Sequence, residues 1–433
     1  MKLKKLIKVT PYFLLACFFV ASSSCGHIKN STSSIQISRA EDVGFSSERL
    51  MCIDSLLSHA VNAGTMPNAL TYIYRHGKLV YHKAFGWKNI ESKEPVQLNS
   101  IFRIASQTKA LTSVGLMILY EKGLFQLDDS VSKYIPEFKN SQVLISINSK
   151  DSSFASRPAK RPITIRDLLT HTSGIPYGNL AYQKAHIPSV NSLEKLTIGD
   201  VVKKIAKLPL DHDPGEEFTY GLSTDVIGYL IEVLSGMPLD QYMKQAVFDP
   251  LDMKDTYFYL PAEKVARLVT LYANDSINGK LHTSENISNQ TFPYAGARTY
   301  FSGGAGVVGT ISDYANFCQM LLEGGNYNGK QVLGRKTIEL MLRNQIADLE
   351  VWETKNKFGL GFELTTDKGA AILPRSVGAF SWGGMYATNY LIDPKEDMFM
   401  LIYTNAEPFF NNVNGRFFNL VYQALLAKNK HEN

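Results

Sequence analysis

The sequence predicts an α/β fold of the α+β kind, in which both ends of the chain build one antiparallel sheet and a helical lobe is inserted between them. Runs rich in β-branched and aromatic residues lie near both ends of the 433-residue chain. The middle instead shows apolar residues at helical spacing. Helical patterns also flank the strand-rich ends, so we expect the terminal helices to cover the sheet.

The first predicted elements are a helix and a β-hairpin. The helix covers residues 46–63, where apolar side chains recur on one face. Two β-rich runs follow, 69–75 and 79–85, and the turn His76-Gly77-Lys78 joins them. The next helix is expected over 106–122, because a glycine ends the apolar pattern there.

The middle and the tail of the chain continue this alternation. Residues 140–162 are predicted to form a polar loop. Helices are then expected over 164–170, 199–207, 222–235, 239–246, 311–323 and 335–344. The tail has β runs at 358–366, 376–382, 386–392 and 398–404, followed by an amphipathic helix over 409–427.

The N-terminus has the composition of a secretory signal. Its first residues carry lysines and no acid, and the apolar run that follows is too short for a comfortable membrane span. Cys25 stands where a bacterial lipoprotein signal places its lipidated cysteine, although Ser22 replaces the aliphatic residue of that signal. Cys17 has the better local match, but the apolar run continues past it. We therefore expect export to the bacterial periplasm or cell envelope with a lipid anchor at Cys25; plain secretion is the alternative.

These patterns divide the chain into five predicted parts. They are a signal peptide (1–24), a flexible tether (25–41), the first part of the α/β lobe (42–105), a helical lobe (106–290) and the second part of the α/β lobe (291–433).

The charge of the body gives no argument for a nucleic-acid partner. The formal net charge is +5, but four of the 45 basic residues lie in the signal segment, which leaves 41 against 40 acidic ones. Membrane contact is expected through the lipid anchor alone. Cys52 and Cys318 each lie in a helical apolar pattern, so we expect two buried free thiols. No spacing of His, Cys, Asp and Glu suggests a metal site, and no cofactor is expected.

The central chemical signal is Ser106-Gln107-Thr108-Lys109. Residues three apart share one helix face, so Lys109 is expected one turn from the Ser106 hydroxyl. A serine hydroxyl is a poor nucleophile unless a base takes its proton, and burial in a cleft between lobes would lower the pKa of the lysine toward that role. Alone, the motif is weak, because a capping serine with a surface lysine has the same spacing.

Further motifs follow in a fixed order. They are Pro162-Ile-Thr-Ile-Arg-Asp-Leu-Leu-Thr-His171-Thr-Ser-Gly174, Pro214-Gly215-Glu-Glu-Phe-Thr-Tyr220, Phe248-Asp-Pro-Leu-Asp-Met253, Ser302-Gly-Gly-Ala-Gly306 and Trp382-Gly383-Gly384. This order resembles the class C β-lactamase-like family of serine hydrolases, which includes esterases, D-amino-acid peptidases and penicillin-binding proteins. The resemblance covers roughly residues 42–425 and implies a β-lactamase/transpeptidase-like fold.

The resemblance also implies roles for individual residues. Ser106 would be the nucleophile and Lys109 its partner. Tyr220 matches the tyrosine of the family's Tyr-x-Asn element, where it would exchange protons with Lys109 and Ser106; Leu222 departs from the asparagine. The backbone N–H groups of Ser106 and Met385 would form the oxyanion hole.

Substrate contacts are expected on the third family element. Trp382-Gly383-Gly384 stands where Lys-Thr-Gly or His-x-Gly is usual, and this departure resembles the esterase-like branch. The two glycines would let substrate approach the strand closely. Asp225 is assigned to substrate binding, either as an acceptor behind the site or as a solvated helix residue.

Other conspicuous residues are expected to be structural. Tyr177-Gly178-Asn179 is a literal Tyr-x-Asn, but it follows the wrong turn, so Tyr177 is interpreted as a loop tyrosine. His171 is expected to serve as a scaffold. The glycine-rich run after Ser302 lacks the lysine of a phosphate loop and is expected to be a packing turn.

The sequence thus predicts an exported serine hydrolase that cleaves an ester or amide of a small-molecule or peptide substrate through an acyl-enzyme, esterase-like in type. The enzymatic alternative is a D-amino-acid or peptidoglycan peptidase or a weak β-lactamase. The alternative of another class is an inactive binding module. A cation needed by a β-lactamase would have to come from elsewhere, and the basic loop 140–162 is the candidate source, with Lys150, Arg157, Lys160 and Arg161.

Overall fold

The structure is a computed structural model that describes residues 37–275, 280–407 and 412–427. The predicted signal peptide, Cys25 and most of the tether lie outside the described residues. Within the described part, no helix has the length and apolar character needed to cross a membrane. The described residues belong to one compact unit. The lobe boundaries after residues 105 and 290 stay a prediction.

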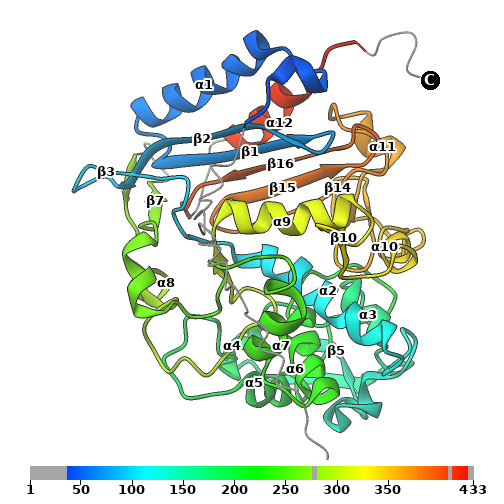
Figure 1. The fold of residues 1–433 in the computed structure, drawn as a ribbon. Helices are drawn as coiled ribbons and strands as arrows, with labels where there is room; N and C mark the ends of the chain where they lie inside the picture. The colour runs from blue at the N-terminus through cyan, green and yellow to red at the C-terminus, as the bar shows by residue number, and fades with distance from the viewer. Residues whose placement is uncertain (1–36, 276–279, 408–411, 428–433) are drawn as a thin grey trace, which may run out of the picture. The chain divides into compact units, whose positions relative to one another are not determined.

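The chain builds one large antiparallel sheet from both of its ends (Figure 1). The central pairing joins an N-terminal strand, β1, to a C-terminal strand, β16, with Tyr72 opposite Leu401. Across the sheet the strands are β12 (Lys357–Phe358), β13 (Glu363–Leu364), β14 (Phe380–Gly384), β15 (Thr388–Asp393), β16 (Met398–Tyr403), β1 (Asn68–Arg75), β2 (Lys78–Asn89) and β3 (Glu94–Pro95). The predicted fold class is therefore confirmed.

The two faces of the sheet are covered differently. Helices α1 (Ser47–Asn62) and α12 (Val413–Gln423) cover one face, where Ile53, Ile73 and Phe417 share a core. Helix α9 (Ile311–Leu322) lies on the other face, where alternate strand residues such as Leu401 point. Because side chains alternate across a strand, β1 and β16 bury both of their faces.

The helical layer lies on the α9 side of the sheet (Figure 1). Its centre is α2 (Thr108–Glu121), which is buried along nearly its whole length and packs against α6 (Ser223–Ser235). The surrounding helices are α3 (Ile165–Leu169), α4 (Leu180–Lys184), α5 (Ile198–Ile205) and α7 (Leu239–Met243), which continues into a π-helical turn. Threonine caps begin α3 and α5, since each side chain accepts the third backbone N–H.

Smaller elements complete the described chain. The two-stranded ribbons are β4–β9 (Phe102–Arg103 with Val308–Gly309), β5–β6 (Gln142–Ile147 with Phe154–Pro158), β7–β8 (Tyr272–Asn274 with Leu281–Thr283) and β10–β11 (Asn326–Tyr327 with Lys330–Gln331). The remaining helices are α8 (Ile287–Thr291), α10 (Arg335–Met341) and α11 (Asp367–Ala370).

Three local predictions are wrong. Much of the predicted polar loop 140–162 is the β5–β6 hairpin, because its first strand hydrogen-bonds to the backbone of Leu210. Cys52 is exposed rather than buried, since the buried face of α1 carries Leu50, Ile53 and Leu57 instead. The β run 358–366 is interrupted by Gly361, whose φ of 99° turns the chain between two short strands. Cys318 is a buried free thiol, as expected.

Candidate active site

The turn that carries Ser106, the predicted nucleophile, is called the nucleophile turn, and its backbone conformation is strained. Ala105, directly before Ser106, is buried and has a φ of 44°, a region that costs free energy for any residue with a side chain. A 3-10 turn over Ala105–Gln107 then leads into α2, so the regular helix begins two residues later than predicted. The buried Tyr403 hydroxyl donates to Oε1 of Gln107 at 2.6 Å and fixes the turn against the sheet. The strain is thus supported by tertiary packing.

Lys109 is the centre of the site. Its Nζ donates three hydrogen bonds: to Ser106 Oγ at 3.3 Å, to the Tyr177 hydroxyl at 2.6 Å and to the Gly304 carbonyl at 2.8 Å. An ammonium has three N–H donors, whereas a neutral amine has two, so this set matches the charged form. Burial lowers the pKa of Lys109, but the electrostatic and hydrogen-bond effects of Tyr177 and Tyr220 outweigh it and raise the pKa above its usual value. From the sequence, burial is expected to leave Lys109 neutral, and burial does act in that direction, but the net effect is the opposite one.

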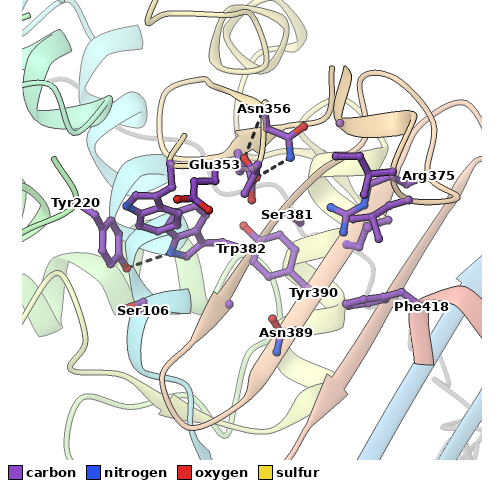
Figure 2. Close-up of a pocket in the computed structure, with 18 of the residues that line it drawn as sticks. Ser106, Tyr220, Glu353, Asn356, Arg375, Ser381, Trp382, Asn389, Tyr390 and Phe418 are labelled. Carbon is purple, nitrogen blue, oxygen red and sulfur yellow. Dashed lines mark hydrogen bonds between the residues drawn. The ribbon is translucent and has the colours of Figure 1, made fainter. Parts of the chain in front are cut away.

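The ring of Tyr220 lies next to the Lys109 ammonium. The Lys109 Nζ is 4.7 Å from the centre of the Tyr220 ring. The Tyr220 hydroxyl accepts a hydrogen bond from Trp382 Nε1 at 3.1 Å, and Figure 2 shows its hydroxyl end directed toward Ser106. Ser106, Lys109 and Tyr220 therefore lie together, as predicted. The tyrosine hydroxyl at 2.6 Å from Lys109 Nζ, however, is that of Tyr177.

His171 holds Tyr220 in place. Its backbone carbonyl accepts from the N–H of Thr219, and its ring centre is 4.8 Å from that of Tyr220. The ring is buried, and burial followed by the charge of Lys109 keeps the pKa of His171 well below its usual value. A neutral imidazole packed on the tyrosine is a scaffold, in line with the sequence-based expectation.

Tyr177 is the site residue that the sequence interpretation missed. Its ring lies against that of Tyr220, with the ring centres 5.3 Å apart. Burial raises the pKa of Tyr177 to about 12, while the charge of Lys109 acts in the opposite direction. The signal was present as Tyr177-Gly178-Asn179, but Asn179 serves another purpose, because its side chain caps α4. We refer to Ser106, Lys109, Tyr177 and Tyr220 as the Ser-Lys-Tyr cluster.

Asp225 supports the cluster from behind. It is buried, and its Oδ1 accepts hydrogen bonds from the Tyr300 hydroxyl at 2.9 Å and from Ser302 Oγ at 2.7 Å. These bonds fix the glycine-rich turn whose Gly304 carbonyl accepts from Lys109. The structure thus places Asp225 away from the cavity surface, behind the site, and the glycine-rich run serves as the packing turn that the sequence predicts.

A cavity of about 1040 Å³ opens beside the cluster. Ser106, Tyr220 and Met385 line it, together with a wall made of Trp352 and Trp382, whose rings stack with centres 5.7 Å apart (Figure 2). Trp352 is one of the residues that sequence reasoning missed, since nothing in its local pattern connects it to Trp382. The wall is apolar and suits an apolar substrate group.

The glycines of β14 have close neighbours within the protein, and Gly383 also lines the cavity, so the expected approach of substrate to this strand stays a prediction. A Cβ on Gly384 would overlap the carbonyl oxygen of Ile104, just before the nucleophile turn, and a Cβ on Gly383 would overlap the side chain of Asn389. The close neighbours are thus parts of the protein itself. Gly384 lets β14 approach the nucleophile turn, which places Met385 beside Ser106 at the cavity.

The basic loop does not deliver a cation to this cavity. Three of its four named cations are held by carboxylates outside the cavity lining: Arg157 pairs with Asp213, Lys160 with Glu216 and Arg161 with Asp167. None of these residues lines the cavity among the described residues. The described residues as a whole contain no group of three His, Cys, Asp or Glu side chains suited to a metal ion.

Comparisons with known proteins agree with this geometry. A family model described as Beta-lactamase matches residues 53–422. Esterase EstB of Burkholderia gladioli is 26% identical over 82% of this chain and 90% of its own. A putative D-alanyl-D-alanine carboxypeptidase of Escherichia coli K12 is also 26% identical, over 85% of each chain. The solved structure of EstCE1, a hydrolase with promiscuous acyltransferase activity, has a TM-score of 0.73 at 26% identity and covers 88% of this chain and 99% of its own.

The Gly384→Ala substitution should reduce stability because its Cβ has no room beside Ile104. Overpacking of this kind costs about 1–3 kcal/mol, which urea unfolding measures. Gly178→Ala is the matched control, since its Cβ meets no atom within 4 Å, and its free energy of unfolding should stay the same or rise slightly. Equal stability of the two variants would contradict the close approach of β14 to the nucleophile turn.

Proposed function

The chain belongs to the beta-lactamase family, and we propose that this serine hydrolase cleaves small esters through an acyl-enzyme formed on Ser106. The observation that carries the proposal is the Ser-Lys-Tyr cluster, which opens onto an aromatic-walled cavity. The nucleophile, a buried cation and two tyrosine hydroxyls are all in place, which is not the pattern of a decayed site.

In the first half-reaction, Tyr220 acts as a phenolate whose own proton has gone to solvent, and it takes the proton of Ser106 Oγ as that oxygen attacks the ester carbonyl carbon. The Trp382 N–H and the nearby Lys109 ammonium stabilise negative charge on that tyrosine, and Tyr220 then gives the proton to the departing alcohol. In the second half-reaction, water replaces the alcohol and releases the carboxylic acid. Ester and water are thus converted into acid and alcohol, and the enzyme is unchanged.

Lys109 acts as a fixed charge rather than as the base. Its raised pKa keeps it protonated at neutral pH. Its three hydrogen bonds leave it no free N–H, so it holds Ser106 and Tyr177 in position while its charge favours the anionic transition state. The backbone N–H groups of Ser106 and Met385 are the proposed oxyanion hole.

The cavity favours esters over β-lactams and stem peptides. Those substrates present a carboxylate near the scissile bond, and no cation stands on β14 beside Ser106. The missing charge-assisted hydrogen bond costs about 1.5–3 kcal/mol of binding, roughly ten- to a hundredfold. The stacked pair Trp352 and Trp382 instead offers an apolar surface to an acyl or alcohol group. The similarity to Esterase EstB and to the hydrolase EstCE1 also supports a preference for esters.

Export and anchoring are proposed from the N-terminal sequence. The lysine-rich start, the short apolar run and Cys25 are the features of a lipoprotein signal. A lipid anchor would hold the hydrolase at the cell envelope through the tether that precedes α1.

Ester preference is tested by comparing kcat/KM for p-nitrophenyl butyrate and nitrocefin. We expect the ester to be cleaved at least tenfold faster, because β14 carries no cation beside Ser106 for the carboxylate of the β-lactam. A fluorophosphonate probe should label Ser106, and Ser106→Ala should abolish labelling and turnover. Equal turnover of nitrocefin would support the β-lactamase alternative, and an unlabelled wild-type protein without turnover would support the inactive binding module.

The role of Tyr220 is tested against that of Tyr177 by two phenylalanine variants. Tyr220→Phe should lower kcat by about 10²–10⁴-fold, because it removes the proposed proton acceptor. Tyr177→Phe removes a hydrogen-bond partner of Lys109 and should cost less. A larger loss for Tyr177→Phe would instead assign the proton transfer to Tyr177.

Lipidation is tested by cell fractionation of the full chain. Two or three acyl chains anchor a protein firmly, at about 0.8 kcal/mol per buried CH₂. Cys25→Ser should therefore move the protein from the membrane fraction to the soluble fraction, whereas Cys17→Ser serves as the matched control. If Cys25→Ser leaves the distribution unchanged, the anchor is not at this cysteine.

A further inference from the structure

Arg375 is the one cation among the described residues that line the cavity. It lies on the segment between α11 and β14, and its side chain is partly buried. Within the described part of the chain its guanidinium makes no hydrogen bond and no ion pair. Burial lowers the pKa of Arg375, as expected for a cation without a contacting anion. A partly buried arginine is normally paired with an anion, so this position favours an anionic ligand.

The nearest carboxylates are occupied by other groups. Glu363 accepts a hydrogen bond from Asn356 Nδ2 at 2.7 Å. Asp393 is fully buried and accepts from the Tyr422 hydroxyl at 2.6 Å and from the backbone N–H of Ser376 at 3.1 Å. Both carboxylates influence Arg375 electrostatically, but neither forms an ion pair with it. As far as the described residues show, the five donors of the guanidinium are available to a ligand in the cavity.

Ser106 and Arg375 line the same cavity, which also carries exposed apolar side chains. Figure 2 shows Ser106 and Arg375 on opposite sides of the residues that line it, with the guanidinium nitrogens of Arg375 facing inward. The lining of the same cavity includes Trp352, Ile372 and Met385, each more than half exposed. Exposed large apolar side chains around one cavity indicate contact with an apolar ligand segment.

We propose that Arg375 binds a carboxylate at the end of the substrate remote from its scissile ester. The substrate class is then an ester acid: an ester bond at Ser106, an apolar spacer along the tryptophan wall and a terminal carboxylate on Arg375. A guanidinium binds a carboxylate with two parallel hydrogen bonds. A phosphate dianion fits less well, because Glu353 and Glu363 also line the cavity and repel it. This inference rests on the proposed ester hydrolysis and adds the identity of the remote group.

The test uses mono-p-nitrophenyl esters of straight-chain dicarboxylic acids, from succinic to suberic acid, each paired with its methyl-capped neutral counterpart. In the wild-type protein the best acid-terminated ester should have a kcat/KM at least tenfold above its neutral counterpart, with an optimum chain length. Arg375→Met should lower the kcat/KM of each acid-terminated ester to that of its neutral counterpart. Lys368→Met is the matched control, since Lys368 lies on the preceding helix with 76% of its side chain exposed, and it should keep the preference.

Binding to the Ser106→Ala protein separates this inference from the proposed function. Calorimetric titration of that protein with the best acid-terminated ester should give a Kd at least tenfold tighter than after the additional Arg375→Met substitution. A wild-type preference for the neutral esters at every length, or equal Kd values with and without Arg375→Met, overturns the inference. Arg375-dependent binding without turnover of any ester would instead overturn the proposed function and leave the carboxylate site standing.

Discussion

The hydrogen bonds of one buried ammonium organise this site. Lys109 reaches Ser106 on its own turn, Tyr177 on the loop after α3 and Gly304 on the turn before β9. These three segments are distant in sequence, so the site forms only when the start of α2, the loop after α3 and the turn before β9 have packed together. A buried charge that loses a partner is costly, and this cost makes the arrangement specific.

The backbone conformation around Ser106 also positions the site. Ala105 adopts a strained φ so that Ser106 stands at the cavity, and Gly384 has no side chain so that β14 fits against Ile104. Arg103, two residues before Ala105, is fully buried and donates to the backbone carbonyls of Val269 and Asn289. The nucleophile turn is thus fixed on both sides by long-range contacts, which supplies the rigidity that a preorganised site requires.

The sequence predicted those features that depend on local periodicity. The helix α1, the β1–β2 hairpin and the C-terminal strands follow from apolar spacing, and the pairing of Ser106 with Lys109 follows from the helical repeat. Tyr177 was missed because its place depends on packing between distant segments of the chain. A Cβ on Gly221 would overlap the carbonyl oxygen of Ile175, so the segment that leads to Tyr177 lies directly against the segment that follows Tyr220. The pKa of Lys109 was predicted in the wrong direction for the same reason, since the hydroxyls that raise it come from residues 68 or more positions away.

The absence of a carboxylate from the lysine's contacts has a catalytic consequence. Among the described residues, Lys109 is bonded to a serine, a tyrosine and a backbone carbonyl, and the nearby Asp225 accepts from Tyr300 and Ser302 instead. An ion pair would neutralise the ammonium in the resting enzyme. In the proposed reaction these three hydrogen-bond partners carry no formal negative charge at rest, so the ammonium can stabilise the negative charge that develops on the attacking serine and on the carbonyl oxygen. The interaction is then stronger in the transition state than in the ground state, which is the condition for lowering the barrier.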